Sequence, residues 1–269
     1  MVVIGIGQAG CNIVSNFSKS HKKIMIDSDL FPSTCKTTED YENKCPSLKK
    51  ELNFRAKECW VILCGSGKVA GATLRILEKI KNKKINVLYV YPDPDMSTPL
   101  QLKRNKVVFN VLQQYTRSGM LNTFNIVSNR QALQIAGEGP ISSVYRSVNE
   151  TIANIVETIE YFKTQTPVLG NIAETKEISR IRTFGIGFLE KNQEKMLFLL
   201  DNPTEISYIY SISEEELEER TDLLSIIKQK VVNDRSSNII SSFSIFSSPY
   251  NKSFYYSIKC THYIQLEEI

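Results

Sequence analysis

The chain has 269 residues, 42% of them hydrophobic, which is enough for one large α/β domain and a smaller domain, each with its own core. The formal charge of +4 comes from 33 basic and 29 acidic side chains without a dominant basic block, so no nucleic-acid footprint is expected. Because no apolar run approaches the roughly 20 residues of a membrane span and no basic leader opens the chain, we expect a soluble, cytoplasmic protein without a membrane partner.

The first half of the chain alternates strands with helices. Strands are predicted at residues 2–6, 23–26, 59–63, 85–91 and 123–127, and helices at 9–18, 70–80, 100–115 and 130–136. This rhythm predicts a parallel sheet that is covered by helices on both faces.

A long helix and a second, smaller domain are predicted to follow. Residues 141–162 carry apolar side chains along one helical face, which is long enough to connect two domains. Beyond residue 170, strands at 184–189, 195–201, 239–246 and 254–264 and an acidic helical stretch at 214–230 predict a small α+β fold. The expected organisation is a nucleotide-binding α/β domain at 1–140, a central connecting helix at 141–165 and a smaller α+β domain at 166–269.

The six cysteines follow no pattern typical of a metal site. They include no CxxC pair, and only His21 and His262 are available to complete a ligand set, so we expect no protein-built metal centre. The thiols expected to be reduced and mostly buried are Cys11, Cys35, Cys45, Cys59, Cys64 and Cys260.

The first glycine loop fits the spacing G-x-G-x-x-G between a strand and a helix. At Gly5, Gly7 and Gly10 the backbone N–H groups can approach a phosphate at the positive end of the helix. Asp27 ends the next strand, where a dinucleotide fold places its ribose-binding acid. This segment alone therefore also fits a nicotinamide-dependent oxidoreductase.

A second glycine loop at residues 65–71 also stands between a strand and a helix. It offers another set of backbone donors, which a nucleoside triphosphate needs and a dinucleotide does not. The P-loop pattern is not met, because Val69 follows Gly67 and Lys68. The structural alternative is that both loops serve tight strand-to-helix packing.

Read together, these segments resemble the tubulin/FtsZ family along nearly the whole chain. GIGQAGCN at 5–12 resembles its first nucleotide loop, with Gln8, Ala9 and Asn12 at matching positions. The resemblance continues with Ile-Asp-Ser-Asp at 26–29, which includes Asp29, and with GSGKVAGA at 65–72 in place of GGGTGTGA. Two hydroxyls are thereby lost, and Ser66 and Lys68 supply a donor and a charge instead.

The end of the family site that reads the base is also represented. Asn129, in SNRQAL, stands where the family has an asparagine that hydrogen-bonds guanine. Tyr145 and Asn149 are four residues apart on the long helix, which brings them to one face. In tubulin, residues at these positions stack on the base and read its edge. Residues 91–104 resemble the segment that lies against the sugar.

In this family the next subunit supplies the hydrolytic acids through a loop with the pattern Asn-x-Asp-x-x-Asp. Here the matching stretch begins at Asn171, and Ala173 and Lys176 occupy the two acidic positions. A lysine cannot deprotonate water as a carboxylate does, and β-tubulin has a lysine that faces a nucleotide that is not hydrolysed. Glu174 and Glu177 keep the spacing of three, so a register shift of one residue could restore catalysis, although the favoured explanation is that they are solvated acids at a helix start.

The resemblance implies a guanine-nucleotide-binding subunit that joins itself head to tail, with weak or absent GTP hydrolysis. It implies GTP or GDP as the ligand, with Mg²⁺ as an ion that could accompany it, and a divergent bacterial, plasmid or phage source. A non-polymerising structural or regulatory protein is the first alternative and the oxidoreductase is the second. The implied nucleotide contacts are Gly7, Gln8, Ala9, Asn12, Asp29, Gly65, Ser66, Gly67, Lys68, Asn129, Tyr145 and Asn149, and Asn171 and Lys176 are the implied contacts to the neighbour's nucleotide.

Overall fold

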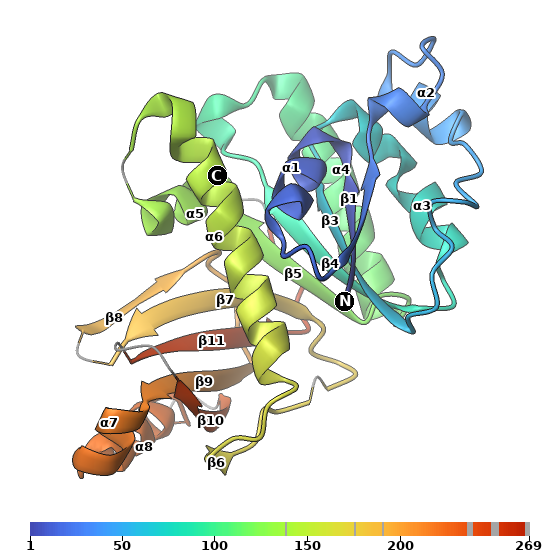
Figure 1. Ribbon diagram of the computed structural model, residues 1–269. Coiled ribbons are helices and arrows are strands. Elements are labelled where there is room, and N and C mark those ends of the chain that lie inside the picture. Colours follow the sequence, from blue (N-terminus) through green and yellow to red (C-terminus); the bar gives the residue numbers. More distant parts are fainter. Residues whose placement is uncertain (138, 175, 190, 236–238, 249–252, 267–269) are drawn as a thin grey trace. The chain divides into compact units, whose positions relative to one another are not determined.

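The computed structural model describes residues 1–137, 139–174, 176–189, 191–235, 239–248 and 253–266. The chain divides into two compact units, each described here by itself (Figure 1). Unit 1 comprises Met1–Asn154 together with Leu266, and unit 2 comprises Ile155–Gln265. The long helix α6, Ile141–Phe162, begins in unit 1 and ends in unit 2, with the bounds that the sequence predicts.

Unit 1 is built on a parallel sheet, as the alternation of strands and helices predicts. The strands follow the order β2-β1-β3-β4-β5, and each described neighbouring pair is parallel. Side chains along β1, β3, β4 and β5 are buried with few exceptions, as expected for strands that are covered on both faces. The strands are β1 Val2–Ile6, β2 Lys22–Ile26, β3 Glu58–Cys64, β4 Lys84–Tyr91 and β5 Thr123–Ser128.

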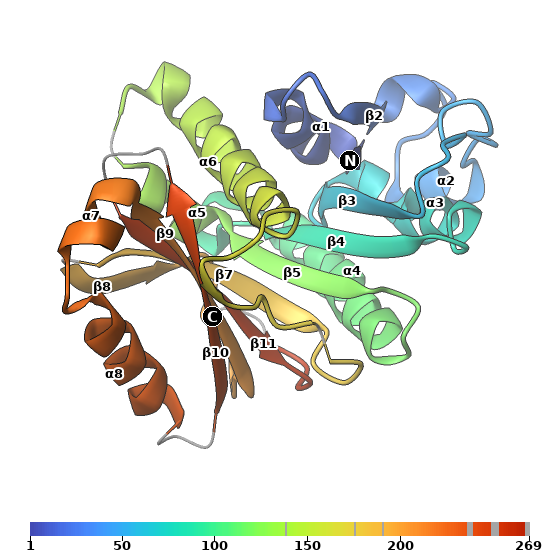
Figure 2. The ribbon, with the colours of Figure 1, turned by 60° about the horizontal axis from the view of Figure 1, so that its bottom comes forward.

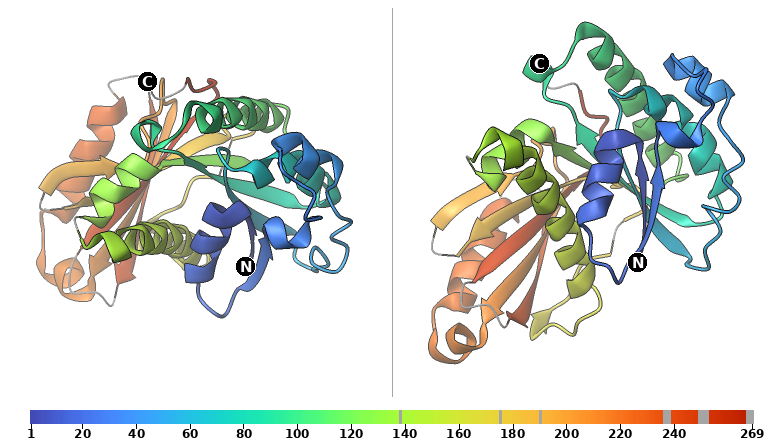
Figure 3. Two further views of the ribbon diagram at one scale, coloured as in Figure 1. Left: turned by 90° about the horizontal axis from the view of Figure 1, so that it is seen from above. Right: turned by 45° about the horizontal axis from the view of Figure 1, so that its top comes forward.

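The helices of unit 1 cover both faces of this sheet, and Figure 3 shows α1 and α4 on opposite sides of the strands. One turn, α2, was missed within the polar stretch after β2. Thr37 and Asp40 form its capping box, a local signal that the sequence does contain. The helices are α1 Gly7–Asn16, α2 Thr38–Asn43, α3 Thr73–Lys79, α4 Pro99–Arg117 and α5 Asn129–Ala136, with short 3₁₀ turns at Ser28–Leu30, Lys68–Ala72 and Pro94–Met96.

Unit 2 contains a mixed sheet in the order β7-β11-β9-β10-β6, with β8 paired to β7. β9 and β10 run parallel, whereas β11 is antiparallel to both β7 and β9. The central strand β9 was missed, although its apolar side chains alternate with serines in the way typical of a strand. The strands are β6 Leu169–Gly170, β7 Ile181–Phe188, β8 Lys191–Met196, β9 Glu205–Ser213, β10 Ile240–Ser248 and β11 Phe254–Thr261.

The predicted acidic helix at 214–230 is in fact two helices, α7 Glu214–Glu219 and α8 Leu223–Arg235. Arg220 leaves the helical conformation and pairs with Asp222, which ends the first helix. α8 then packs Ile227 and Val231 against Tyr208, on one face of the sheet (Figure 2). Among the described residues, no helix is long and apolar enough to cross a bilayer.

The cysteines are all free, as expected from their spacing. Cys59 and Cys260 are fully buried, and the other four cysteines are half-buried. Burial raises the pKa of the Cys59 thiol to about 12, which keeps it protonated.

Candidate functional site

The topology of unit 1 predicts where a ligand can bind. The chain runs from β1 outward to β2 and then crosses back to β3, which lies on the other side of β1. At such a switch point, the loops after β1 and β3 diverge to opposite faces and leave a crevice at the carboxyl ends of the strands. Both glycine loops of the sequence stand at this crevice, since one follows β1 and the other follows β3.

A cavity of about 430 Å³ lies at this edge of the sheet, and we call it the switch-point cavity. Its volume is within the range of small-molecule sites. Every segment that follows β1, β3, β4 or β5 contributes to its walls, together with α6. The lining residues are Ala9, Cys64, Ser66, Pro92, Asp93, Met96, Ser97, Asn129, Leu133, Tyr145 and Val148.

In the first loop the three glycines have different tasks. A Cβ on Gly10 would overlap the carbonyl oxygen of Ile62, and a Cβ on Gly5 would lie 2.7 Å from the Gly10 carbonyl carbon, so both allow α1 to approach the sheet. Gly7 has a φ of +70°, which glycine adopts without strain. Two of the three glycines therefore serve packing, which is the structural alternative that the sequence left open.

The start of α1 presents donors to this edge of the sheet. Its cap residue, Ile6, has no side-chain hydrogen bond to the helix, and no acidic residue stands in the first turn. The first N–H groups of a helix have no partner within the helix, and they carry a partial positive charge. They can therefore bind an anionic group placed beside Ala9.

The second loop is shaped by one close contact. A Cβ on Gly65 would collide with the hydroxyl of Tyr89, and that hydroxyl is fixed by a 2.6 Å hydrogen bond to Asn105 Oδ1. Gly67 is different, because no atom lies within 4 Å of a Cβ built there and its φ of −76° suits any residue. The packing of unit 1 thus requires glycine at position 65 and leaves position 67 open.

Two thiols near the loops are poor nucleophiles. Burial, followed by the nearby charge of Asp27, raises the pKa of Cys11 to about 11. Burial also raises the pKa of Cys64, whose Sγ lies 3.2 Å from Ser66 Oγ. Both cysteines therefore remain thiols at neutral pH, and the site has polar rather than thiolate chemistry.

The opposite wall of the cavity combines an amide with an aromatic ring. Asn129 begins α5 directly after β5, and within the described part of the chain its side-chain amide has no hydrogen-bond partner. Tyr145, on α6, is 59% exposed and lines the same cavity. An unpaired amide and an open ring are the groups that recognise a planar base by hydrogen bonding and stacking.

Sequence reasoning missed a pair of ion pairs that connects the loop after β4 with α5, and we call it the clasp. Arg130 Nη2 lies 3.0 Å from Asp93 Oδ1 and 2.6 Å from Asp95 Oδ2. Asp93 also caps the 3₁₀ turn at Pro94–Met96, because its carboxylate accepts from the Asp95 N–H. The loop after β4 is thereby held against α5. The sequence signal was an arginine directly after Asn129, which had no assigned role.

The predicted residues of unit 1 differ in how they relate to the cavity. Four of them line it: Ala9, Ser66, Asn129 and Tyr145. Four others are within two residues of a lining residue: Gly7, Gln8, Gly65 and Gly67. Asn149 does not line the cavity, and the preceding residue, Val148, lies in the wall where Asn149 was expected. Asn12, Asp29 and Lys68 do not line it, and all three are exposed.

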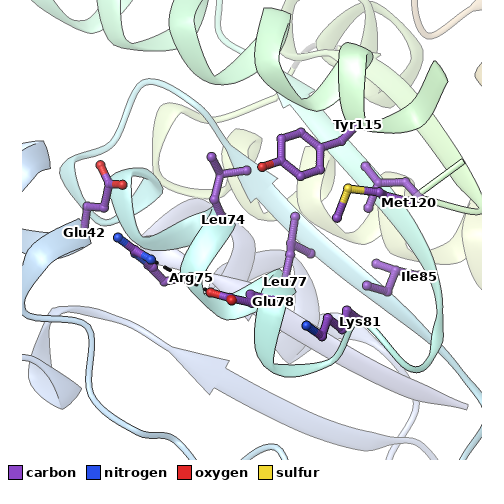
Figure 4. Close-up of a pocket in the computed structure, with 10 residues that line it drawn as sticks. Glu42, Leu74, Arg75, Leu77, Glu78, Lys81, Ile85, Tyr115 and Met120 are labelled. Carbon is purple, nitrogen blue, oxygen red and sulfur yellow. Dashed lines mark ion pairs between the residues drawn. The ribbon is translucent and has the colours of Figure 1, made fainter. Parts of the chain in front are cut away.

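A second cavity in unit 1, of about 390 Å³, lies at the opposite edge of the sheet (Figure 4). Ile85, at the start of β4, and Leu121, just before β5, mark this edge. Leu74, Tyr115 and Met120 point toward its interior in Figure 4, and the Arg75–Glu78 ion pair, at 3.9 Å, lies at its side. It contains none of the predicted residues and neither glycine loop.

The segment predicted to meet a neighbouring subunit lies in unit 2. Ala173, Glu174 and Lys176 line a cavity of about 90 Å³ together with residues of the sheet. Lys176 Nζ lies 3.8 Å from Glu205 Oε1 on β9. Asn171 and Glu177 are exposed and are not in the wall of this cavity. Among the described residues of the chain, no cluster of three or more His, Cys, Asp or Glu side chains could hold a metal ion.

Comparison with solved structures identifies the fold. No protein-family model and no curated protein sequence matches the chain. An empty FtsZ dimer from M. jannaschii matches with a TM-score of 0.70 at 14% identity, over 97% of this chain and 87% of that one. A GTPγS-bound protofilament of CetZ2 from Haloferax volcanii matches with a TM-score of 0.66 at 15% identity, over 96% and 92% of the two chains.

A third match comes from another filament protein. The GTPγS-form protofilament of TubZ from Bacillus thuringiensis serovar israelensis has a TM-score of 0.66 at 12% identity, over 96% of this chain and 85% of that chain. All three similarities extend over nearly the whole sequence, and at such low sequence identity they show the fold alone. The chain therefore has a tubulin/FtsZ-like fold, as the resemblance of its glycine loops leads one to expect.

Proposed function

We propose that the switch-point cavity binds GTP or GDP and that subunits join head to tail into filaments with weak or absent GTP hydrolysis. The observation that carries this proposal is the meeting of Ala9, Ser66, Asn129 and Tyr145, four residues chosen from the sequence, in the wall of one cavity. That cavity stands at the carboxyl ends of parallel strands, where nucleotides bind in α/β sheets. The nucleotide-bound protofilaments of CetZ2 and TubZ have the same fold.

In the proposed complex the phosphates lie between the two glycine loops. The free N–H groups at the start of α1 and the backbone around Ser66 and Gly67 supply the donors. Lys68, Gln8 and Asn12 are exposed at or near these loops and add a charge and polar groups at the rim. Because Gly67 has no packing role within unit 1, we infer that it leaves room for a phosphate.

The base lies at the other end of the cavity in this proposal. Asn129 offers one acceptor and two donors, which suit O6, N1–H and the N2 amine of guanine. Tyr145 stacks on the ring, and Asn149 is the next candidate for the base edge. Mg²⁺, if used, would be held mainly by phosphate oxygens and water, as this ion prefers, because the described residues provide no carboxylate cluster.

The weak hydrolysis follows from the chemistry at residues 171–177. Ala173 has no functional group, and Lys176 is positively charged, so neither can accept a proton from water. Lys176 and Asn171 would instead contact the phosphates of the neighbouring subunit and stabilise the contact between subunits. Glu174 and Glu177 are the acids that a shifted register would bring into use.

One observation favours the non-polymerising alternative as a second candidate. Lys176 already pairs with Glu205 of its own subunit, and this pair must open before the ammonium can serve a neighbour. Sedimentation across protein concentration, with GTP, with GDP and without nucleotide, separates the two functions. Pelleting that depends on guanine nucleotide supports the filament, and a monomer at every concentration supports the alternative. No observation favours the oxidoreductase.

The nucleotide proposal is tested with Asn129→Ala and the matched control Asn110→Ala, since Asn110 is exposed on α4. Loss of the base contacts should weaken GTP binding by about tenfold or more. The control should bind as the wild type does, measured by isothermal titration calorimetry. Equal affinity of both variants for GTP would exclude Asn129 from the site, and tighter binding of NAD⁺ than of GTP by the wild type would overturn the proposal.

A further inference from the structure

Unit 2 contains a buried arginine without a partner. Arg182, near the start of β7, is 7% exposed, and its Nε is buried without a hydrogen-bond partner. Among the described residues of the chain, none forms a hydrogen bond or an ion pair with its guanidinium. A buried charge is costly unless it is paired, so an arginine in this state favours the binding of an anion beside it.

One acid of the sheet, Glu205, shares a cavity with Arg182 but is paired with a lysine. Arg182 pairs in register with Cys260 on β11, and Cys260 pairs with Glu205 on β9. Arg182 and Glu205 are therefore two strands apart, about 10 Å between their Cα atoms at ordinary strand spacing. Glu205 faces Lys176 instead, at 3.8 Å. The charges of this lysine and this glutamate neutralise each other, so the positive charge of Arg182 is left without a counter-ion in the described part of the chain.

Arg182 lines the 90 Å³ cavity whose walls also contain Lys176 and Ser207, together with the carboxylates of Glu174 and Glu205. The hydroxyl of Ser207 is likewise buried without a hydrogen-bond partner, in a residue that is 8% exposed. Two unsatisfied donors thus line one small cavity. The cavity has room for a few water molecules, so it suits a single oxyanion and is too small for a nucleotide.

We propose that this cavity is a binding site for a small oxyanion such as inorganic phosphate or a carboxylate. The guanidinium fork binds such a group through two parallel hydrogen bonds, and Ser207 donates a third. Lys176 lies at the same wall, so the bound anion competes with Glu205 for its ammonium group. This site is separate from the switch-point cavity and does not depend on nucleotide binding there.

The test is a titration of the full chain with inorganic phosphate, and then with acetate, followed by NMR. The expected result is saturable shifts of the Arg182 side-chain Nε–H signal and of the Ser207 amide. Shifts at Gly65 and Ser66 report phosphate at the glycine loops and are counted separately. The proposal is overturned if phosphate shifts only the glycine-loop signals, or if neither anion shifts a signal near Arg182.

A pair of variants completes the test. Arg182→Met keeps the bulk of the side chain and removes the charge, and Arg180→Met changes a neighbouring arginine whose Nε donates to the Glu177 carbonyl oxygen. Phosphate affinity at Ser207 should fall about tenfold or more in Arg182→Met and stay at the wild-type value in Arg180→Met. In phosphate-free buffer, Arg182→Met should melt at or above the wild-type temperature. A much lower melting temperature would mean that Arg182 has a protein partner, which contradicts the proposal.

Discussion

Substitution of Gly67 should affect protein stability and ligand binding in different ways. No atom lies within 4 Å of a Cβ added there, and φ is −76°, so Gly67→Ala introduces neither a clash nor strain. Replacing glycine by alanine at a compatible position reduces the freedom of the unfolded chain. We therefore expect the free energy of unfolding to stay constant or to rise by about 0.4–1 kcal/mol.

The same substitution should weaken GTP binding if the second glycine loop holds phosphate. Alanine keeps the backbone N–H, but its methyl group would occupy the space of a phosphate oxygen and move that oxygen away from the donor. Losing one hydrogen bond from a backbone N–H to a charged oxygen costs about 1.5–3 kcal/mol, which is a loss of roughly 10- to 150-fold in affinity. Urea denaturation measures the first effect, and calorimetric titration with GTP measures the second. Gly139→Ala is the matched control, because no atom lies near a Cβ there either and Gly139 does not line the cavity.

Two outcomes would refute this reasoning. GTP affinity within about twofold of the wild type would remove the second loop from the phosphate site. A loss of stability on Gly67→Ala would show that the position is not open. Gly10→Ala provides the contrast, since its Cβ would overlap the Ile62 carbonyl oxygen, and we expect a loss of about 1–3 kcal/mol or more in the free energy of unfolding.

Three further predictions concern charged side chains. Arg130→Gln opens the clasp on the loop after β4, so GTP affinity should fall severalfold while the free energy of unfolding, by urea denaturation, changes by less than about 1 kcal/mol. Asp40 accepts hydrogen bonds from the backbone of Lys36 and Thr37, which holds its pKa well below the ordinary value, so its contribution is present above the ordinary carboxyl pKa and is lost as the pH falls toward the lowered one. Asp40→Asn should accordingly lower the melting temperature at neutral pH, and the difference from the wild type should shrink on acidification. Lys176→Asp restores a carboxylate at one of the two acidic positions. Phosphate release from GTP should therefore be about tenfold or more above that of the wild type and should increase with protein concentration. Release equal to that of the wild type would exclude this position from the hydrolytic site.

The fold of unit 1 was largely readable from the sequence because its signals are local. β-branched runs that end in glycine predict strands before helices, and the apolar face of α6 predicts both of its ends. Strand order is a different matter, since it depends on contacts between distant segments. The switch point between β1 and β3 became visible only in the structure, and it explains why both glycine loops serve one cavity.

Unit 2 was harder to predict for physical reasons. β9 alternates Ile206, Tyr208, Tyr210 and Ile212 with serine and other residues, yet it follows a loop directly and continues into α7 through the Ser213 cap without a break in the sequence. The acidic residues of α7 and the apolar face of α8 merged into one predicted helix. The break lies at Arg220, whose backbone turns to an extended conformation and whose side chain pairs with Glu216 and Asp222.

Residues of the candidate site were predictable where a sequence motif identifies them. They were not predictable where their role depends on a partner that is distant in the sequence. Asn129 and Tyr145 follow from motif spacing. Arg130 and Asp93 meet across 37 positions of sequence, so their pairing is a product of the fold. The unpaired Nε of Arg182 is likewise a product of the fold, because the glutamate in its cavity, Glu205, pairs with Lys176.

The proposed function depends above all on a guanine nucleotide in the switch-point cavity. The most direct measurement is to denature the freshly purified protein by heat, identify the released nucleotide by chromatography, and repeat this after incubation with GTP, ATP and NAD⁺ in equal amounts. We expect stoichiometric GTP or GDP from the wild type and a clear loss from Asn129→Ala. Release of an adenine nucleotide or of NAD⁺, or no bound nucleotide after incubation, would contradict it.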